Sequence, residues 1–378
     1  MDFELSDDQR ALQSAASSLL EERCATARVR QVANESGRLD GALWAAMADQ
    51  GWLAVELPEA SGGLGLGLVE TVVLGEQLGR HVAPVPFLGT VLAAGALAAA
   101  VADGETTGTT TLGSSAVDSW VERLSTGDAV GAVAWSRGPA AVAARSDGDG
   151  GWTLTGRSDL VVYGPSADVV VVVAEVRGDS ALFALAPDDA ERPPSEPAMD
   201  LTRTVGWLAV ADRPALRLGG PEGAERLLDR GATATSAEML GAADCVLEMT
   251  VAYAKDRVQF GRPIGGFQAV KHRCADMLVD VEGMRSATYY AAWAVGAGDP
   301  EAAVAASVAK VWGSDAARRV MASGLQVHGG IGFTWEHDLH LFLKRSQLDQ
   351  ASFGDAVFHR ERLARILRPR AESGLPVL

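Results

Sequence analysis

Hydrophobic positions divide the chain into three segments that differ in periodicity. Up to about residue 121, apolar residues recur at the three- and four-residue spacing of amphipathic helices. Between about 122 and 221 they form short runs, many rich in valine, separated by Gly, Asp and Pro, as in strands joined by turns. The helical spacing then returns. The sequence therefore predicts a helical domain at 1–121, a β domain at 122–221 and a helical bundle at 222–378.

Polar residues, Pro and Gly mark the ends of the predicted helices. Ser6 and Asp7 precede the first helical pattern, where a side-chain oxygen can accept hydrogen bonds from first-turn amides. Pro300 stands in the first turn of a later pattern, which ends at the glycine pair 329 and 330. The C-terminal segment contains four helical stretches, so we expect it to form a four-helix bundle.

The β-prone runs of the central segment have no helical pattern between them. GWTLTGRSDLVVYG and ADVVVVVAEV, for example, follow one another at the spacing of strands joined by turns. Because parallel strands need a long crossover, usually a helix, the pattern favours an antiparallel barrel or sandwich. It disfavours a Rossmann-type dinucleotide-binding domain, which is built from βαβ units.

Composition limits the classes of partner. Of the 378 residues, 48% are hydrophobic, so the chain can bury a large core and form more than one domain. The net charge of −16 argues against binding to nucleic acid, because a basic surface supplies most of the affinity for phosphates. Cys24, Cys245 and Cys274 lack the spacing of a zinc site or a disulfide framework, so we expect buried free thiols.

The N-terminal residues bear on the location of the protein. MDFELSDDQRALQ is acidic and amphipathic, and it lacks the basic and apolar regions of a signal peptide. No uninterrupted apolar stretch reaches the roughly 18 residues that a membrane-spanning helix needs. We therefore expect a cytoplasmic protein without a membrane partner.

Other patterns known from ligand sites are incomplete in this sequence. The loop LPEASGGLGLGL (57–68) precedes a helix and could cradle a phosphate, but it lacks the GxxxxGK[ST] pattern and a clear preceding strand. His328, His337 and His340 do not have the spacing of an HExxH helix, so no metal site is expected. No GxSxG sequence is present, which leaves hydrolase chemistry unsupported.

The densest group of chemically distinctive residues is YAKDRVQFGRPIGGFQAVKHRCADM (253–277). Arg257 closes a helix, Phe260 lies in a turn, and Pro263 stops helical continuation before Gln268 opens the next helix. A helix hairpin requires Gly and Pro, but it does not require Arg, Phe and Gln at one corner. An exposed Arg beside an aromatic ring can hold a pyrophosphate while the ring covers an adenine. A helix-end Arg can also interact only with the helix dipole, and the spacing leaves both interpretations open.

Together with QVHGGIGFTWEHDLHLFLKR (326–345), this stretch resembles the acyl-CoA dehydrogenase family, and the resemblance extends over the whole chain. It implies an α+β fold with an N-terminal helical domain, a central antiparallel β domain and a C-terminal four-helix bundle. It also implies FAD as cofactor, whose ADP half these two motifs contact in the family, largely across a dimer interface. The residues that the resemblance places along the flavin pyrophosphate and adenosine are Arg257, Gln268, Gln326, Val327, His328, Gly329 and Gly330, with Phe260 nearby.

The resemblance also implies a reaction. A carboxylate removes the proton α to an acyl-CoA thioester while the β hydrogen leaves as hydride to the flavin, and an electron-transfer flavoprotein then takes the electrons. Because hydrogen bonds to the thioester oxygen acidify the α carbon, the base and the flavin must lie on opposite faces of the acyl chain.

The sequence departs from the family at both positions where a base is usually found. Counted without gaps from the glycine pair at 329 and 330, the base of the aromatic-Glu-Gly-Thr turn falls on Phe353, which cannot accept a proton. Gly354 keeps the family's glycine, and Asp355 replaces the threonine that starts the last helix. The second position, at the start of the long bundle helix, falls on Gly231. No usual base position therefore carries an acid.

Two acids near these positions are weaker candidates for a displaced base. Asp355 lies between Gly and a helical pattern, so we interpret it first as a helix cap. Glu238 lies about two turns along the long bundle helix, where a cap, a cross-helix hydrogen bond or an interface pair is a commoner role than catalysis. The small residues around Glu238 are compatible with a groove for a bulky acyl group and equally with close helix packing.

A third departure lies in the β segment. The family usually has a Thr-Glu-Pro-x-x-Gly-Ser-like loop around the flavin ring and a Trp-Ile-Thr strand beside it. Here the loop reads AVAWSRGPAAVAA (132–144), in which Trp135 and Ser136 keep some similarity. Leu160 and Val162 replace the Trp and the Thr, which removes stacking area and a hydroxyl. We therefore expect the chain's own flavin-ring pocket to be incomplete.

One hypothesis accounts for the retained and the lost motifs together. Residues that serve a neighbour's FAD are kept, whereas those that serve the chain's own flavin ring and α proton are lost. This resembles the non-catalytic subunit of the α2β2 acyl-CoA dehydrogenases of actinobacterial steroid side-chain breakdown, which pairs with a catalytic paralogue. The alternatives are a self-sufficient homotetrameric acyl-CoA dehydrogenase with a displaced acid, and a flavin-dependent oxygenase of the same fold.

Overall fold

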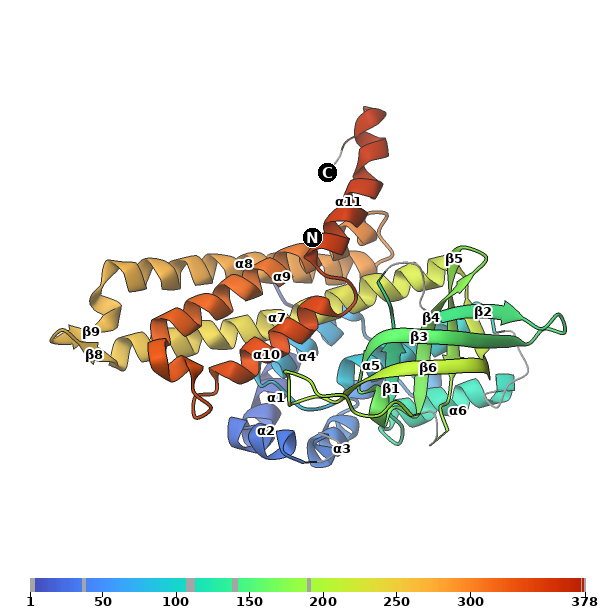
Figure 1. Ribbon diagram of the computed structural model, residues 1–378, viewed down its shortest axis with the longest axis horizontal. Helices are drawn as coiled ribbons and strands as arrows, with labels where there is room; N and C mark the ends of the chain where they lie inside the picture. The colour runs from blue at the N-terminus through green and yellow to red at the C-terminus, as the bar shows by residue number, and fades with distance from the viewer. Residues whose placement is uncertain are drawn as a thin grey trace. The chain divides into compact units, whose positions relative to one another are not determined.

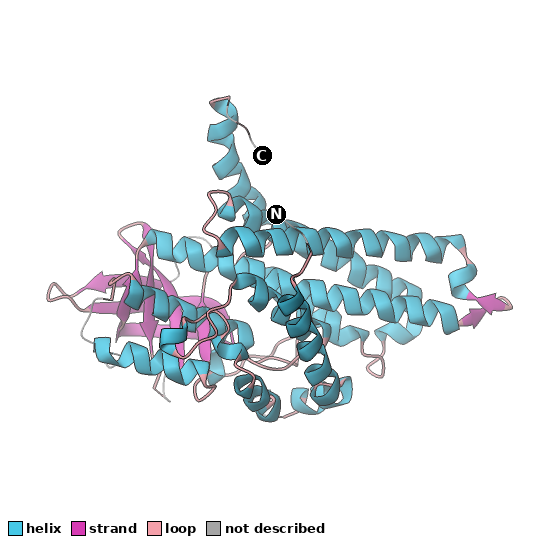
Figure 2. Cartoon of the chain, turned by 180° about the vertical axis from the view of Figure 1, so that it is seen from behind, coloured by secondary structure: helices cyan, strands magenta, loops and turns pink. Residues whose placement is uncertain are grey.

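The computed structural model describes residues 4–35, 39–106, 113–137, 142–188, 192–374 and 376 (Figure 1). Shorter helices come first, strands occupy the middle of the chain, and long helices follow (Figure 1). Figure 2 shows the helices together with a gathered set of strands, which confirms the predicted α+β fold. In these ranges no helix is long and apolar enough to cross a membrane. The α-helices are α1 (Asp7–Arg23), α2 (Thr26–Ala33), α3 (Gly41–Asp49), α4 (Leu68–Arg80), α5 (Phe87–Ala102), α6 (Gly113–Ser125), α7 (Pro221–Asp256), α8 (Gln268–Gly296), α9 (Ala302–His328), α10 (Leu339–Ala351) and α11 (Ala356–Glu372).

The chain forms two compact units, each assembled from separate stretches of sequence. The helical unit contains Met1–Val29, Val72–Ala83 and Ala232–Leu378. The β unit contains Arg30–Thr71 and Pro84–Gly231. This division follows contacts in space, whereas the three predicted domains follow changes of sequence pattern, and their boundaries stay a prediction.

The sheet of the β unit has the strand order β6-β3-β2-β4-β5-β7, with β1 paired to β4. The β1–β4 ladder is parallel, as is the single pair that joins β2 to β4, and the other ladders are antiparallel as predicted. The sheet is thus mixed, because the chain leaves β1, forms the β2–β3 hairpin and only then returns as β4. The strands are β1 (Gly131–Ala134), β2 (Val142–Ser146), β3 (Trp152–Val162), β4 (Val169–Val176), β5 (Asp179–Leu185), β6 (Val205–Pro214) and β7 (Leu216–Gly219).

Strand β4 lies at the centre of the hydrophobic core of the β unit. Its first four residues, Val169 to Val172, are all buried. Helix α5 packs against β1 and β4, so β4 is covered on both faces. A strand covered on both faces is apolar at every position, which explains the continuous valine run in place of an alternating pattern.

Helices α8 and α9 lie side by side in the helical unit, and α10 and α11 pack against α9 (Figure 1). The sequence pattern does not predict α10, because the second half of its buried face is polar: Leu339, Leu341 and Phe342 are followed by Arg345, Ser346 and Asp349. The fully buried guanidinium of Arg345 donates to the carbonyls of Val82 and Ala83, at 3.4 and 3.3 Å. These bonds join α10 to the segment that follows α4.

Helices α4 and α7 contact each other through glycine. A Cβ atom on Gly79 would lie 2.0 Å from the carbonyl oxygen of Glu238, and one on Gly241 would lie 1.8 Å from that of Glu76. Only glycine allows two helix backbones to approach so closely. The small residues around Glu238 therefore serve close packing at this crossing.

The predicted helix ends are largely present. The Ser6 hydroxyl accepts from the Gln9 amide at 3.1 Å, and the Gln9 side chain accepts from the Ser6 amide at 2.9 Å, which forms a capping box. Helix α9 ends at His328 with Gly329 in the left-handed region (φ 65°), as predicted. Pro300 lies just before α9 and not in its first turn, since the helix begins at Ala302.

Candidate functional site

The two motifs of the sequence meet at one end of the helical unit. The ring of Tyr253, in the last turn of α7, stacks on His328, the last residue of α9, with ring centroids 4.6 Å apart. Near the start of α8, the Arg273 guanidinium donates to the Ser323 hydroxyl of α9 at 3.4 Å. The end of α7, the start of α8 and the end of α9 therefore lie together.

The chain between α7 and α8 forms a short hairpin of β8 (Val258–Gln259) and β9 (Arg262–Pro263). Arg257 is fixed at its base, because its amide donates to the Tyr253 carbonyl and its carbonyl accepts from the Ile264 amide, both at 2.8 Å. Phe260, at the tip, has a φ of 53° and is 90% exposed. Its ring meets the edge of Phe267 at a centroid distance of 6.0 Å. The predicted turn is present, and its aromatic tip is open to solvent in this chain.

Three polar side chains at this corner have no partner among the residues that the structure describes. Arg257, Gln268 and Gln326 are exposed, and none of them makes a side-chain hydrogen bond or ion pair with another described residue. A Cβ atom on Gly329 or Gly330 would meet nothing within 4 Å, so the main chain there is open to a ligand. A guanidinium, two amides and an open main chain fit the pyrophosphate and adenosine of FAD. We call Arg257, Phe260, Gln268 and residues 326–330 the helix-end corner.

His328 contributes to this corner through its backbone and its packing. Its side chain is buried, and Nδ1 lies 2.8 Å from the Gly324 carbonyl, to which it donates. Burial lowers the pKa of His328, with His337 contributing in the same direction, so the ring is neutral at pH 7. The His337 ring meets His328 edge-on at 4.6 Å. Sequence reasoning missed the stack on Tyr253, although an aromatic residue one turn before Arg257 was visible.

Metal ligation finds no support in the geometry. Among the residues that the structure describes, no group of three or more His, Cys, Asp or Glu could hold a metal ion. His340 lies beside the Trp335 ring, with centroids 5.0 Å apart. All three cysteines are free, but only Cys24 is fully buried, so the expectation of buried thiols is wrong for Cys245 and Cys274, which are partly exposed.

The turn before α11 contains the first of the usual base positions. Phe353 occupies it with a φ of 53°, and Gly354 follows with a φ of 87°. Asp355 is the N-cap of α11, since its carboxylate accepts from the Phe358 amide at 2.8 Å. The interpretation of Asp355 as a cap is therefore confirmed. Gly231, at the second base position, is buried within α7 and has no side chain to act as an acid.

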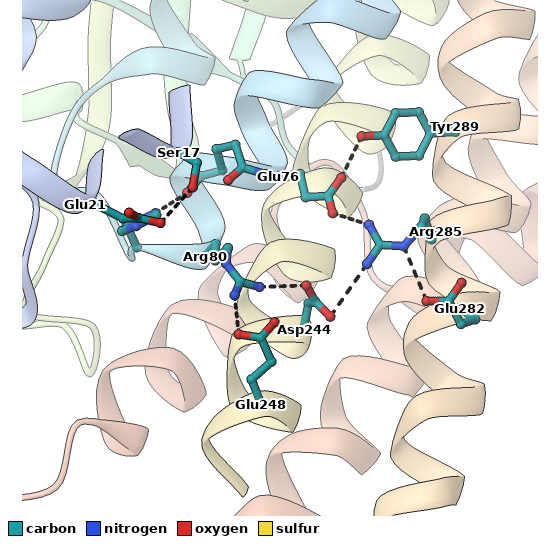
Figure 3. Close-up of polar contacts among 11 residues, drawn as sticks. Ser17, Glu21, Glu76, Arg80, Asp244, Glu248, Glu282, Arg285 and Tyr289 are labelled. Carbon is teal, nitrogen blue, oxygen red and sulfur yellow. Dashed lines mark hydrogen bonds and ion pairs between the residues drawn. The ribbon is translucent and has the colours of Figure 1, made fainter. Parts of the chain in front are cut away.

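Glu238 lies where helices α4 and α7 pack against each other. It is 2% exposed, and its backbone carbonyl lies next to Gly79. Figure 3 shows that other acids of these helices are held in ion pairs and hydrogen bonds. Arg285 of α8 pairs with Glu76 of α4, and the Tyr289 hydroxyl donates to the same carboxylate at 2.6 Å. Burial, together with this carboxylate, raises the pKa of Tyr289 far above its usual value.

Asp244 of α7 extends this network. Its carboxylate pairs with Arg80 of α4 at 2.7 Å and with Arg285 at 3.6 Å, and Arg80 also pairs with Glu248 (Figure 3). The network therefore joins α4, α7 and α8 through two arginines shared among four acids. Carboxylates held in this way stabilise helix packing and are poorly suited to accept a substrate proton.

The structure gives the contacts of the β-unit residues that we expect to replace the family's flavin-ring residues. Leu160 is 41% exposed and lies opposite Trp207 in the β3–β6 ladder. The Arg157 guanidinium lies over the Trp207 ring, 4.6 Å from its centroid. The Ser136 hydroxyl accepts from the Asp159 amide at 2.9 Å, which fixes the loop beside β3. Val162 pairs with Val205 and offers no hydroxyl at its position.

Comparison with known proteins supplies a family for this arrangement. The model described as "Acyl-CoA dehydrogenase, N-terminal domain" matches residues 6–105. The model described as "Acyl-CoA dehydrogenase, C-terminal domain" matches residues 219–367. The chain belongs to the acyl-CoA dehydrogenase family. The resemblance inferred from the two motifs is thus confirmed over both helical regions.

Similar acyl-CoA dehydrogenases are known as sequences and as structures. Acyl-CoA dehydrogenase IpdE2 of Mycolicibacterium smegmatis is 31% identical over 364 residues, which cover 96% of this chain and 98% of the relative. The structure of the ChsE4-ChsE5 complex from Mycobacterium tuberculosis superimposes with a TM-score of 0.87 at 33% identity, covering 97% of this chain and 99% of that one. A Tcur3481-Tcur3483 steroid ACAD variant also gives a TM-score of 0.87, at 31% identity and with the same coverage of both chains.

Proposed function

We propose that this chain is the non-catalytic subunit of a heteromeric acyl-CoA dehydrogenase and that it completes the FAD site of a catalytic paralogue. The observation that carries the proposal is a contrast within the helical unit. The helix-end corner presents polar groups that the chain does not use itself. The base position is occupied by Phe353, and the neighbouring Asp355 is engaged as a cap.

The helix-end corner would hold the ADP half of FAD. Arg257 would pair with the pyrophosphate, and Gln268 and Gln326 would hydrogen-bond the adenosine, while the open main chain at Gly329 and Gly330 allows close approach. When bound, FAD supplies the acceptor for the hydride that leaves the β carbon of the acyl-CoA. An electron-transfer flavoprotein would then receive the electrons.

Proton removal from the α carbon would be the task of the partner. Phe353 has no basic atom, and Gly231 has no side chain. Glu238 is buried at a helix crossing, which disfavours access to a thioester. A chain with this arrangement binds and orients the cofactor's ADP half but leaves acid–base chemistry to the other subunit.

Exposed apolar residues support a partner on the helical unit. Large hydrophobic side chains lie open on α8 and α9, where a chain that worked alone would favour polar residues. Two related structures are named for two different proteins each, ChsE4-ChsE5 and Tcur3481-Tcur3483. A heteromeric α2β2 assembly is the form that we propose for this chain. The exposed apolar residues are Leu278, Val279, Tyr290, Trp293, Val308 and Trp312.

Substitution of Arg257 by Ala tests the cofactor role. The full chain is co-expressed with its catalytic paralogue, and bound FAD is measured by its visible absorbance and by titration of the apoprotein. Loss of a charge-assisted pair to a phosphate costs about 1.5–3 kcal/mol, so FAD affinity should fall roughly ten- to hundredfold. Arg318→Ala is the matched control, because Arg318 is an exposed arginine of α9 whose side chain is 72% accessible.

Unchanged FAD content in the Arg257→Ala complex would overturn the proposed cofactor role. The chain purified alone gives a second, independent result. Stoichiometric flavin with turnover of an acyl-CoA by the solo protein would support the self-sufficient homotetramer instead.

A further inference from the structure

The turn from Ser352 to Asp355 adopts a backbone conformation that its own sequence disfavours. Phe353 has a φ of 53°, in the left-handed region that side chains other than Asn, Asp and Gly rarely adopt. Gly354 has a φ of 87°, and a Cβ atom there would lie 2.4 Å from the Phe358 ring. Such a turn needs contacts from the surrounding structure to hold it.

His359 of α11 supplies one of these contacts. Its side chain is fully buried, and Nε2 lies 2.8 Å from the Phe353 carbonyl. Because a carbonyl oxygen can only accept, Nε2 must carry the proton and donate. The other ring nitrogen, Nδ1, lies 3.1 Å from the Ser307 hydroxyl of α9. A neutral imidazole protonated at Nε2 accepts at Nδ1, so the hydroxyl donates to it.

The hydrogen bonds around His359 form a chain in which each group donates to the next. The Arg362 guanidinium donates to the Ser307 oxygen at 3.2 Å, which leaves the Ser307 proton for His359. The chain of donors thus runs from Arg362 through Ser307 and His359 to the carbonyl of Phe353. The other tautomer of His359 would place two acceptors, the bare Nε2 and the Phe353 carbonyl oxygen, against each other and leave that carbonyl without its donor.

A second contact holds the end of the preceding helix. Lys310 of α9 is fully buried, and its Nζ donates to the carbonyl of Asp349 in the last turn of α10. Carbonyls in a last helical turn lack partners within their helix, so this bond fixes where α10 ends. Two side chains of α9 therefore hold this region: Ser307 acts through His359, and Lys310 bonds directly to the end of α10.

The charges around His359 keep its ring neutral. Burial lowers the pKa of His359 to about 4, and Lys310 and Arg362 act in the same direction. The hydrogen bond to the Phe353 carbonyl and the charge of Asp355 oppose this lowering without reversing it. Lys310 itself is hydrogen-bonded to the backbone carbonyl of Asp349 in α10. At pH 7 the imidazole therefore has the single proton that the donor chain requires.

We infer that His359 is a positioning residue that locks the 352–355 turn in its left-handed conformation. The lock holds position 353, which carries the base in other members of the family, although this chain has Phe there. The meaning of the turn for catalysis rests on the proposed function, but the lock itself does not. The turn is thus held by side chains of α9 and α11.

The test compares His359→Gln and His359→Leu in the full chain. A glutamine amide can donate to the Phe353 carbonyl and accept from Ser307, whereas leucine can do neither. At pH 7 we expect His359→Gln to keep a melting temperature within a few degrees of the wild type. We expect His359→Leu to be cleaved within the turn about tenfold faster by a protease, because the turn opens more often.

Substitution of Phe353 by Gly makes the test specific to backbone conformation. Glycine accepts a positive φ without cost, so the turn no longer depends on the lock. In the Phe353→Gly background, His359→Leu should accelerate cleavage by about threefold or less, a non-additivity that reports direct coupling. Equal acceleration in both backgrounds would overturn the inference, since His359 would then act through packing alone.

The pH dependence gives a second readout that packing would not produce. The folded pKa of about 4 lies below the ordinary value of 6.5, so stability from His359 is complete above pH 6.5 and is lost as pH falls toward 4. The melting temperature of the wild type should therefore fall more steeply between pH 6.5 and pH 4 than that of His359→Gln. Parallel curves would contradict a buried neutral His359. None of these readouts uses FAD or turnover, so they stand or fall independently of the proposed function.

Discussion

Asp355 and Phe353 lie two residues apart and illustrate what single residues reveal. The cap role of Asp355 follows from local chemistry, a Gly before it and a helix after it, and could be predicted from the sequence. The left-handed conformation of Phe353 could not be predicted, because it depends on His359 and Ser307, which approach only in the folded structure. The sequence therefore revealed which residue occupies the expected base position, but not the hydrogen bonds of His359 that hold its backbone.

Substitution of Asp355 separates a cap from a base. Asp355→Ala should lower the free energy of unfolding by about 1 kcal/mol, as loss of an N-cap usually does. Asp355→Asn should be nearly neutral, because asparagine also caps helices well. Neither substitution should change turnover per folded complex, measured as the rate of acyl-CoA oxidation by the co-expressed enzyme. A hundredfold loss of kcat in Asp355→Asn at unchanged FAD content would assign Asp355 to catalysis.

At the scale of elements, the helical unit is joined by close contacts that sequence periodicity only partly reveals. The end of α9 at Gly329 was predictable, since glycine commonly ends a helix. Helix α10 was not, because its buried face turns polar at Arg345, Ser346 and Asp349, which interrupts the apolar pattern. The parallel β1–β4 ladder was also hidden, since strand pairing depends on residues far apart in the chain. Glu238 shows the same limit, because its place at the α4–α7 crossing depends on Gly79.

The ion pairs between α4, α7 and α8 allow a prediction at this scale. Arg285→Met leaves the 3% exposed carboxylate of Glu76 with the Tyr289 hydroxyl as its hydrogen-bond donor among the described residues (Figure 3). An uncompensated buried charge costs about 3–5 kcal/mol, and partial exposure of Arg285 reduces this to roughly 2–3 kcal/mol, measured by urea unfolding. Arg226→Met is the control, because both side chains of its pair with Asp103 are about half exposed, so the pair should contribute about 1 kcal/mol or less. Equal costs for the two substitutions would show that the Glu76 pair has no special role.

At the scale of the whole molecule, the account depends on which functions the chain keeps. Its order of helical, β and helical regions and its family membership were predictable, because long patterns and ordered motifs determine them. The meeting of the two motifs was implied by the resemblance, but the Tyr253–His328 stack that joins them emerges only in the fold. Open polar groups at one corner and an apolar side chain at the expected base position are the two features from which we propose that the chain completes a site without performing its proton transfer.

The number of FAD molecules per chain tests this account most directly. The chain is co-expressed with its catalytic paralogue, the complex is purified, and FAD released by denaturation is compared with the amounts of the two chains. The account predicts one FAD for each pair of different chains, with turnover of an acyl-CoA by the complex and none by this chain alone. One FAD bound for every chain, or turnover by this chain in isolation, would contradict it.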